Sequence, residues 1–222
     1  MNCRIYEKSK QMPDLHANMP IAHAGDDLKT ARCAVILLHG RGSSAEDILG
    51  LAENFYNKRI AFLAPQAANN TWYPYSFLAP IEQNEPWLSS AIARVTGLVQ
   101  NCMAAGIQRN SIVVCGFSQG ACLATESVAR HPAHYGALIA FTGGLIGPSD
   151  LELQHDGSLA ATRALFSSGD PDPHVPWPRV EASARELERM GAQVELMRHP
   201  GRPHTIAKEE LEVARSLIFS LL

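Results

Sequence analysis

Short apolar runs alternate with amphipathic segments along most of this chain. Six runs, rich in β-branched and other apolar residues, are predicted to be strands: 33–38, 60–64, 111–115, 137–141, 163–167 and 194–198. Between them, apolar positions recur at helical spacing, which predicts helices over 43–55, 86–105, 121–130 and 179–190. A last helix carries Leu211, Ala214, Leu217, Ile218 and Leu221 on one face. This alternation indicates the α/β class, with a mostly parallel sheet covered by helices on both faces.

Several helix ends can be placed from the residues that favour them. Ser43-Ser44-Ala45-Glu46 is predicted to open the first helix as a capping box. Pro86 suits the first position of the second helix, and Gly106 is expected to end it. Gly143 to Ala160 has no clear period and is predicted to be irregular.

Residues 66–85 form a long aromatic segment with little periodicity. A loop of this length over a small domain is often a lid or a pocket wall. On that interpretation Trp72, Tyr73 and Phe77 line a substrate pocket. The alternative is a cluster that covers one edge of the core, and the sequence favours neither.

Composition and charge exclude several classes of protein. With 222 residues, 46% apolar and 18% charged, we expect a single globular domain over 1–222 rather than a disordered or fibrous chain. A net charge of −3 gives no electrostatic reason to expect a nucleic-acid partner. No apolar run approaches the ~20 residues that span a bilayer, and the N-terminus has no apolar signal core. We therefore expect a cytoplasmic protein without stable membrane insertion, and homodimerisation is left open.

The five cysteines suggest neither disulfides nor metal binding. Their number is odd and no C-x-x-C pair occurs, which argues against a disulfide framework and a zinc site. Cys33, Cys102 and Cys115 sit in apolar segments and are expected to be buried. Cys122 lies one helical turn after Ser118, and for this residue core packing is favoured over a place in a site.

A nucleophile motif stands between the run 111–115 and the helix that follows it. Gly116-Phe117-Ser118-Gln119-Gly120 fits the G-x-S-x-G turn by which α/β-hydrolases expose a catalytic serine. Glycines at both ends leave room where a Cβ would collide with neighbouring backbone. Ser118 is therefore the candidate nucleophile.

A serine hydroxyl needs a base, and the base needs a group that fixes its tautomer. In α/β-hydrolases the chain order is Ser, acid, His, which places the acid after 163–167 and the base after 194–198. Asp170 and Asp172 both fit the acid, and spacing does not separate them. His204, in the loop before the last helix, is preferred as base over His199, which ends the strand.

A tetrahedral intermediate also needs hydrogen-bond donors for its oxyanion. One is expected to be the backbone N–H of Gln119, which follows the nucleophile. The loop His39-Gly40-Arg41-Gly42 fits the second contribution, through the Arg41 N–H. The Arg41 side chain is expected to be solvated, with binding of a negative substrate group as the alternative.

These motifs together resemble the phospholipase/carboxylesterase family, which includes acyl-protein thioesterases and bacterial carboxylesterases and is related to dienelactone hydrolases. The resemblance runs from about Val35 to the C-terminus. It rests on five strings: Leu38-His39-Gly40-Arg41-Gly42, Ala64-Pro65-Gln66-Ala67, Gly116-Phe117-Ser118-Gln119-Gly120, Gly169-Asp170-x-Asp172-x-x-Val175-Pro176 and the late His204. It implies an α/β-hydrolase fold, a cofactor-free and metal-free triad of Ser118, Asp172 and His204, and oxyanion donors at Arg41 and Gln119.

The resemblance also orders the candidate functions. A serine hydrolase that cleaves small to medium carboxylic esters through an acyl-enzyme intermediate comes first, with a small-molecule ester as its partner. A lysophospholipase or acyl thioesterase is the alternative, but Arg41 and Ser43-Ser44 stand where eukaryotic thioesterases have an apolar residue and an acidic turn. A dienelactone hydrolase-like enzyme would normally have cysteine at Ser118. A catalytically silent binding protein on the same fold is the non-enzyme alternative.

Overall fold

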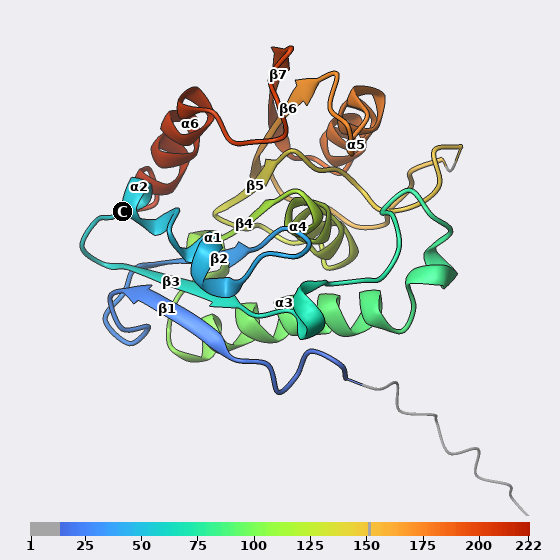
Figure 1. Cartoon of the computed structure of the whole chain (residues 1–222). Coiled ribbons are helices and arrows are strands. Elements are labelled where there is room, and N and C mark those ends of the chain that lie inside the picture. Colours follow the sequence, from blue (N-terminus) through green and yellow to red (C-terminus); the bar gives the residue numbers. More distant parts are fainter. Residues whose placement is uncertain (1–13, 151) are drawn as a thin grey trace, which may run out of the picture.

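A seven-stranded sheet lies between two layers of helices in the computed structural model, which describes residues 14–150 and 152–222 (Figure 1). The strands are β1 (Ile21–Gly25), β2 (Cys33–Leu38), β3 (Ile60–Pro65), β4 (Ile112–Phe117), β5 (Ala137–Phe141), β6 (Arg163–Asp170) and β7 (Gln193–Pro200). Their order across the sheet is β1-β3-β2-β4-β5-β6-β7. All neighbouring pairs are parallel except β1 with β3.

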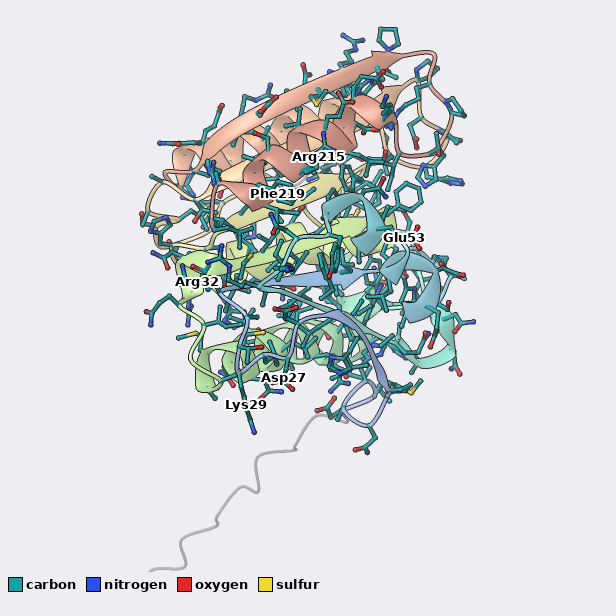
Figure 2. The ribbon with its side chains drawn as sticks, turned by 90° about the vertical axis from the view of Figure 1, so that its left-hand side faces the viewer. Asp27, Lys29, Arg32, Glu53, Arg215 and Phe219 are labelled. Carbon is teal, nitrogen blue, oxygen red and sulfur yellow. The ribbon has the colours of Figure 1, made fainter. Side chains whose placement is uncertain are left out.

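The helices divide between the two faces of the sheet and bury a separate apolar cluster on each. On one face lie α3 (Trp87–Ala104), α4 (Gln119–Arg130) and α5 (Trp177–Arg189). On the other lie α1 (Ala45–Leu49), α2 (Ala52–Phe55) and α6 (Lys208–Phe219). Helices α2 and α6 contact each other on this second face. In Figure 2, the label Glu53 identifies α2 and the label Phe219 identifies the end of α6. Short 3-10 turns cover Ala68–Asn70, Ile81–Asn84 and Arg109–Ser111.

The predicted α/β class and the α/β-hydrolase fold are confirmed, and every predicted strand is present. Strand β1 was not expected, because its sequence Ile21-Ala22-His23-Ala24-Gly25 is short, and in the structure it is only partly buried. It is followed by a charged turn with Asp27, Lys29 and Arg32, visible in Figure 2 at the end of the sheet where β2 begins. No helix among residues 14–150 and 152–222 is long and apolar enough to cross a membrane.

Two helix starts differ from the prediction by one residue. The capping box of α1 uses Ser44 and Asp47 instead of Ser43 and Glu46, and the Ser43 hydroxyl donates to Asp47 at 2.9 Å. Pro86 is the residue before α3 rather than its first position. At α1 the neighbouring pair Ser44 and Asp47 offers the same hydrogen bonds as Ser43 and Glu46 would, and helix boundaries of this kind are uncertain by a residue from sequence alone.

The turn from β4 into α4 consists of Ser118 alone. Its φ of 55° and ψ of −120° are unfavourable for a residue with a Cβ, so the surrounding packing must hold it there. A Cβ on Gly116 would lie 2.3 Å from the Gly120 carbonyl carbon, and a Cβ on Gly120 would lie 2.1 Å from the Leu38 oxygen. Glycine is required at both places because backbone, which cannot move aside cheaply, fills the space.

We expect Gly120→Ala to destabilise the protein by about 3 kcal/mol or more, since the new methyl group overlaps the end of β2. Gly97→Ala is the matched control, because a Cβ there meets nothing within 4 Å. That variant should be more stable than the wild type by about 0.5–1 kcal/mol, as for other glycines inside helices. Urea unfolding of both variants measures the difference, and equal stabilities would contradict this account of the turn.

Candidate active site

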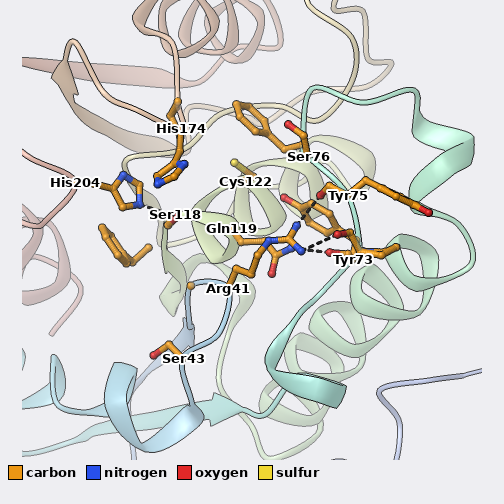
Figure 3. A pocket seen from close by; sticks show the side chains of 15 residues that line it. Arg41, Ser43, Tyr73, Tyr75, Ser76, Ser118, Gln119, Cys122, His174 and His204 are labelled. Carbon is orange, nitrogen blue, oxygen red and sulfur yellow. Dashed lines mark hydrogen bonds between the residues drawn. The ribbon is translucent and has the colours of Figure 1, made fainter.

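Three side chains from separate loops form a continuous hydrogen-bonded chain. The Ser118 hydroxyl lies 2.9 Å from His204 Nε2, and His204 Nδ1 lies 2.8 Å from Asp172 Oδ2. Ser118 follows β4, Asp172 follows β6, and His204 lies between β7 and α6. The carboxyl ends of parallel strands meet at one edge of the sheet, and the three residues converge at this edge. Figure 3 shows Ser118 and His204 there.

The Asp172 carboxylate is held on both oxygens. Oδ1 accepts the N–H groups of His174 and Val175, each at 2.9 Å, while Oδ2 accepts from His204. Burial by itself would raise the pKa of this carboxyl, but these three hydrogen bonds lower it below its ordinary value. An ionised Asp172 can only accept, so the His204 ring carries its proton on Nδ1 and presents a free lone pair at Nε2 to Ser118.

The two competing residues lie elsewhere. Asp170 Oδ2 pairs with Arg198, whose Nε is 2.7 Å away. His199 Nε2 lies 3.1 Å from the Ser167 hydroxyl. The geometry therefore favours Asp172 and His204, the residues preferred in the sequence analysis.

The loop after β2 packs against the serine turn. A Cβ on Gly40 would lie 3.5 Å from Ser118 Cβ, which shows how closely the loop approaches. Neither the Arg41 N–H nor the Gln119 N–H donates a hydrogen bond to another residue of the described chain. Both predicted donors are therefore available beside Ser118.

The buried side chain of His39 connects the loop after β2 to residue Ala67. His39 Nδ1 lies 2.8 Å from the Gly40 oxygen and Nε2 lies 3.1 Å from the Ala67 N–H, so the ring is neutral with its proton on Nδ1. Burial lowers the pKa of His39. His16 has the same arrangement, accepting from the Ala68 N–H and donating to the Trp72 oxygen, and its pKa is also lowered by burial. The sequence analysis assigned no role to either ring.

Trp72 does not line the pocket, which corrects the prediction for this residue. It is fully buried, its ring packs against His39, and its Nε1–H donates to the His39 oxygen at 2.9 Å. It therefore supports the loop that carries Arg41.

The side chain of Gln119 joins the serine turn to the aromatic segment. Its Oε1 accepts the Trp72 N–H at 3.0 Å, and its Nε2 donates to the Tyr73 oxygen at 2.8 Å. Sequence reasoning used only the backbone of Gln119. The available signal was a glutamine directly after Ser118, at a position expected to be buried. A buried amide needs hydrogen-bond partners, so its side chain could have been expected to bind a neighbouring loop.

The Arg41 side chain is exposed, as the first expectation had it, but it also binds specific backbone groups. It donates to the Pro74 oxygen at 2.8 Å and to the Tyr75 oxygen at 2.5 Å (Figure 3). It also lies 5.9 Å from the centre of the Tyr73 ring. Arg41 thus ties the loop after β2 to the aromatic segment.

A cavity of about 520 Å³ opens beside Ser118 and His204. Its walls include Tyr73 and Phe77, as predicted, and Phe117 and Val175. Cys122 also lines it, so this residue is both buried and part of the site, where the sequence analysis favoured packing alone. The segment 73–77 supplies one wall, which favours the pocket interpretation of the aromatic loop over the core-cover one.

His174, also in the wall, packs edge-on against His204, with ring centres 5.0 Å apart. Within residues 14–150 and 152–222 no group of three potential metal-ligating side chains occurs. The expectation of a cofactor-free site stays a prediction.

The two neutral histidines predict a loss of stability in mild acid. Their pKa values are lowered in the folded protein, whereas an unfolded histidine titrates near ~6.5, so below about pH 6.5 the unfolded state binds more protons. Stability should fall by up to about 1.4 kcal/mol per pH unit for each histidine in this range. In His39→Gln, His16 is the one remaining member of this pair. The free energy of unfolding, measured with urea, should therefore change with pH between 6.5 and 5 about half as steeply as in the wild type. An unchanged slope would mean that His39 is not held neutral.

Comparison with known proteins agrees with this geometry. A family model described as Phospholipase/Carboxylesterase matches residues 25–221. A probable carboxylesterase SOBER1-like from Arabidopsis thaliana is 28% identical over 203 residues, covering 84% of this chain and 78% of the relative. Acyl-protein thioesterase 1 from Saccharomyces cerevisiae is 24% identical, covering 86% of this chain and 93% of the relative.

Solved structures are similar as well. A phospholipase/carboxylesterase from Dyadobacter fermentans has a TM-score of 0.86 and 45% identity, over 90% of this chain and 96% of the other. The resemblance inferred from the motifs is confirmed. With a family model matched over nearly its whole length, this chain belongs to the phospholipase/carboxylesterase family of α/β-hydrolases.

Proposed function

We propose that this protein is a serine carboxylesterase that cleaves small to medium carboxylic esters through an acyl-enzyme intermediate. The observation that carries the proposal is the unbroken chain of hydrogen bonds from Ser118 through His204 to Asp172, beside a cavity of about 520 Å³. Relatives that are named carboxylesterases support the same reaction class.

In the proposed reaction, the Ser118 Oγ attacks the ester carbonyl carbon while His204 Nε2 takes the hydroxyl proton. The carbonyl oxygen becomes an oxyanion that the Arg41 and Gln119 N–H groups stabilise. As the tetrahedral intermediate collapses, His204 gives the proton to the leaving alcohol and the acyl group stays on Ser118. Water then repeats the two steps with His204 as base, which releases the acid and restores the serine.

Asp172 supplies two things to His204. Its carboxylate holds the tautomer that leaves Nε2 free, and its charge stabilises the imidazolium formed in each step. Because the pKa of Asp172 is lowered, it remains ionised through the neutral range where such a base operates.

A thioester hydrolase is the second candidate, because one relative is named an acyl-protein thioesterase. The same triad attacks either bond. Comparing oxygen and sulfur esters of one acyl chain, over a series of chain lengths, distinguishes the two activities.

Ser118→Ala should lose nearly all esterase activity and all labelling by a fluorophosphonate. Asp172→Asn should lower kcat by about 10⁴, since the wrong histidine tautomer is then favoured. Asp170→Asn is the matched control, because that carboxylate pairs with Arg198 at the same strand end and should keep near-normal turnover. Initial rates on 4-nitrophenyl butyrate measure all three variants. An inactive Asp170→Asn beside an active Asp172→Asn would reverse the assignment of the acid.

Two substitutions at Arg41 separate its backbone from its side chain. Arg41→Pro deletes the N–H and should lower kcat by about 10²–10³, the cost of one oxyanion donor. Arg41→Ala keeps the donor but removes the tie to Pro74 and Tyr75, so kcat should fall less and KM should rise. Steady-state kinetics on variants with native circular dichroism checks both, and a folded Arg41→Pro enzyme with undiminished kcat would remove this loop from the oxyanion site.

A further inference from the structure

One polar group in the cavity wall has no partner within the described chain: the phenol hydroxyl of Tyr73. The side chain is 1% exposed, and its oxygen makes no hydrogen bond with residues 14–150 or 152–222. Tyr73 lines the same cavity as Ser118 and His204 (Figure 3). A buried hydroxyl without a partner costs stability, so its retention in a substrate cavity calls for an explanation.

The fold prevents this hydroxyl from turning toward a partner. The Tyr73 carbonyl oxygen accepts from the Gln119 side chain at 2.8 Å and from the Thr71 hydroxyl at 2.9 Å. The Arg41 guanidinium covers the ring. The Cys122 thiol lies close enough to the Tyr73 hydroxyl to affect its pKa, but a thiol is only a weak hydrogen-bonding group and the pair does not reach hydrogen-bond geometry.

A second buried tyrosine shows that this fold can satisfy such a group. Tyr135 is 4% exposed, and its hydroxyl donates to the His131 oxygen at 2.8 Å. The difference between the two residues is that Tyr73 faces the substrate cavity.

The rest of the cavity limits what can meet the Tyr73 hydroxyl. Phe77, Phe117 and Val175 contribute apolar surface, and the Arg41 guanidinium is engaged by two backbone oxygens. Burial raises the pKa of Tyr73 well above its ordinary value, so the phenol stays protonated and remains a donor. An uncharged acceptor loses less hydration than an anion when it enters a cavity with these apolar walls.

We propose that Tyr73 is a specificity residue whose hydroxyl donates a hydrogen bond to an uncharged oxygen in the chain of the substrate, apart from the ester that reacts with Ser118. The preferred substrates are then esters whose acyl or alcohol chain carries an ether, hydroxyl or keto oxygen. This inference rests on the proposed esterase function and names the substrate class of the same site. A site with a buried donor discriminates against an analogue that lacks the acceptor, because the donor is then left unpaired.

The test replaces one methylene of the substrate by oxygen at successive positions. The acyl series contains 4-nitrophenyl hexanoate and its analogues with oxygen at chain position 4 or 5. The alcohol series contains the acetates of pentan-1-ol and 2-ethoxyethanol. Their hydrolysis is measured by pH-stat titration of the acid released. For each pair, kcat/KM of the oxygen ester is divided by that of the hydrocarbon ester, and the ratio for the wild type is divided by the ratio for Tyr73→Phe.

Differences in intrinsic ester reactivity cancel in this double ratio. At the favoured position it should be about fivefold to tenfold, the value of one neutral hydrogen bond. Tyr135→Phe is the matched control and should give the wild-type ratio, because Tyr135 does not line the cavity. A double ratio of one at every position of both series would overturn the proposal. A double ratio for the carboxylate ester mono(4-nitrophenyl) glutarate that exceeds those of the uncharged oxygen esters would show that the preferred acceptor is charged, which contradicts the proposed substrate class.

Thermal unfolding gives a readout that does not depend on turnover. Tyr73→Phe removes a hydroxyl without a protein partner, so its melting temperature should equal or exceed that of the wild type, whereas Tyr135→Phe should melt lower. A lower melting temperature for Tyr73→Phe would mean that the hydroxyl is already satisfied in the free protein, which contradicts the inference.

Failure of the proposed function looks different. If the wild type shows no Ser118-dependent turnover of any ester, the esterase proposal falls and this inference falls with it. If Ser118-dependent turnover is present and the double ratios equal one, only the inference is overturned. Should Tyr73→Phe not fold, the wild-type ratios are compared instead with the rates of hydroxide hydrolysis of the same ester pairs, and equality of the two would overturn the inference.

Discussion

The contact between the end of β2 and the start of α4 is the constraint on which the rest of the site depends. Gly120 approaches the Leu38 oxygen so closely that no side chain fits between them. This approach holds Ser118 at its positive φ and brings Gly40 against it. The nucleophile and the two free N–H groups are therefore positioned by backbone packing, which leaves side chains free for other tasks.

Those side chains hold the aromatic segment in place. His16 and His39 each receive one backbone N–H of the segment through a neutral ring nitrogen, while Gln119 and Arg41 bind its carbonyl oxygens. A segment without strands and with little helix would otherwise leave buried backbone groups unpaired. These four residues thus satisfy backbone groups of a long loop that lacks the hydrogen-bond ladder of a sheet.

The hydroxyl of Tyr73 is a buried polar atom without a hydrogen-bond partner in the wall of the cavity beside Ser118. Its neighbours are hydrogen-bonded by Gln119 and Arg41, the two residues proposed to supply the oxyanion donors, so the cavity wall is tied to the loops beside Ser118. In such a site, a substrate contact with the wall can help to orient the ester bond at Ser118.

The sequence by itself determined the α/β class, the strands from β2 to β7 and the choice of Ser118 as candidate nucleophile, because hydrophobic periodicity and the paired glycines of the turn are local properties. It also indicated His204, through chain order. It could not separate Asp170 from Asp172, since both lie at the carboxyl end of β6 and only the direction of each side chain decides which one meets His204. The motif resemblance favoured Asp172, and the tertiary structure supplied the geometric reason.

Long-range pairing decided the remaining features. Trp72 and Tyr73 are adjacent and aromatic, yet one supports the loop after β2 and the other faces the cavity. Arg41 is exposed, as expected, but its guanidinium also binds carbonyl oxygens more than thirty positions away. Such contacts depend on which segments the sheet brings together, and neither period nor propensity encodes that information.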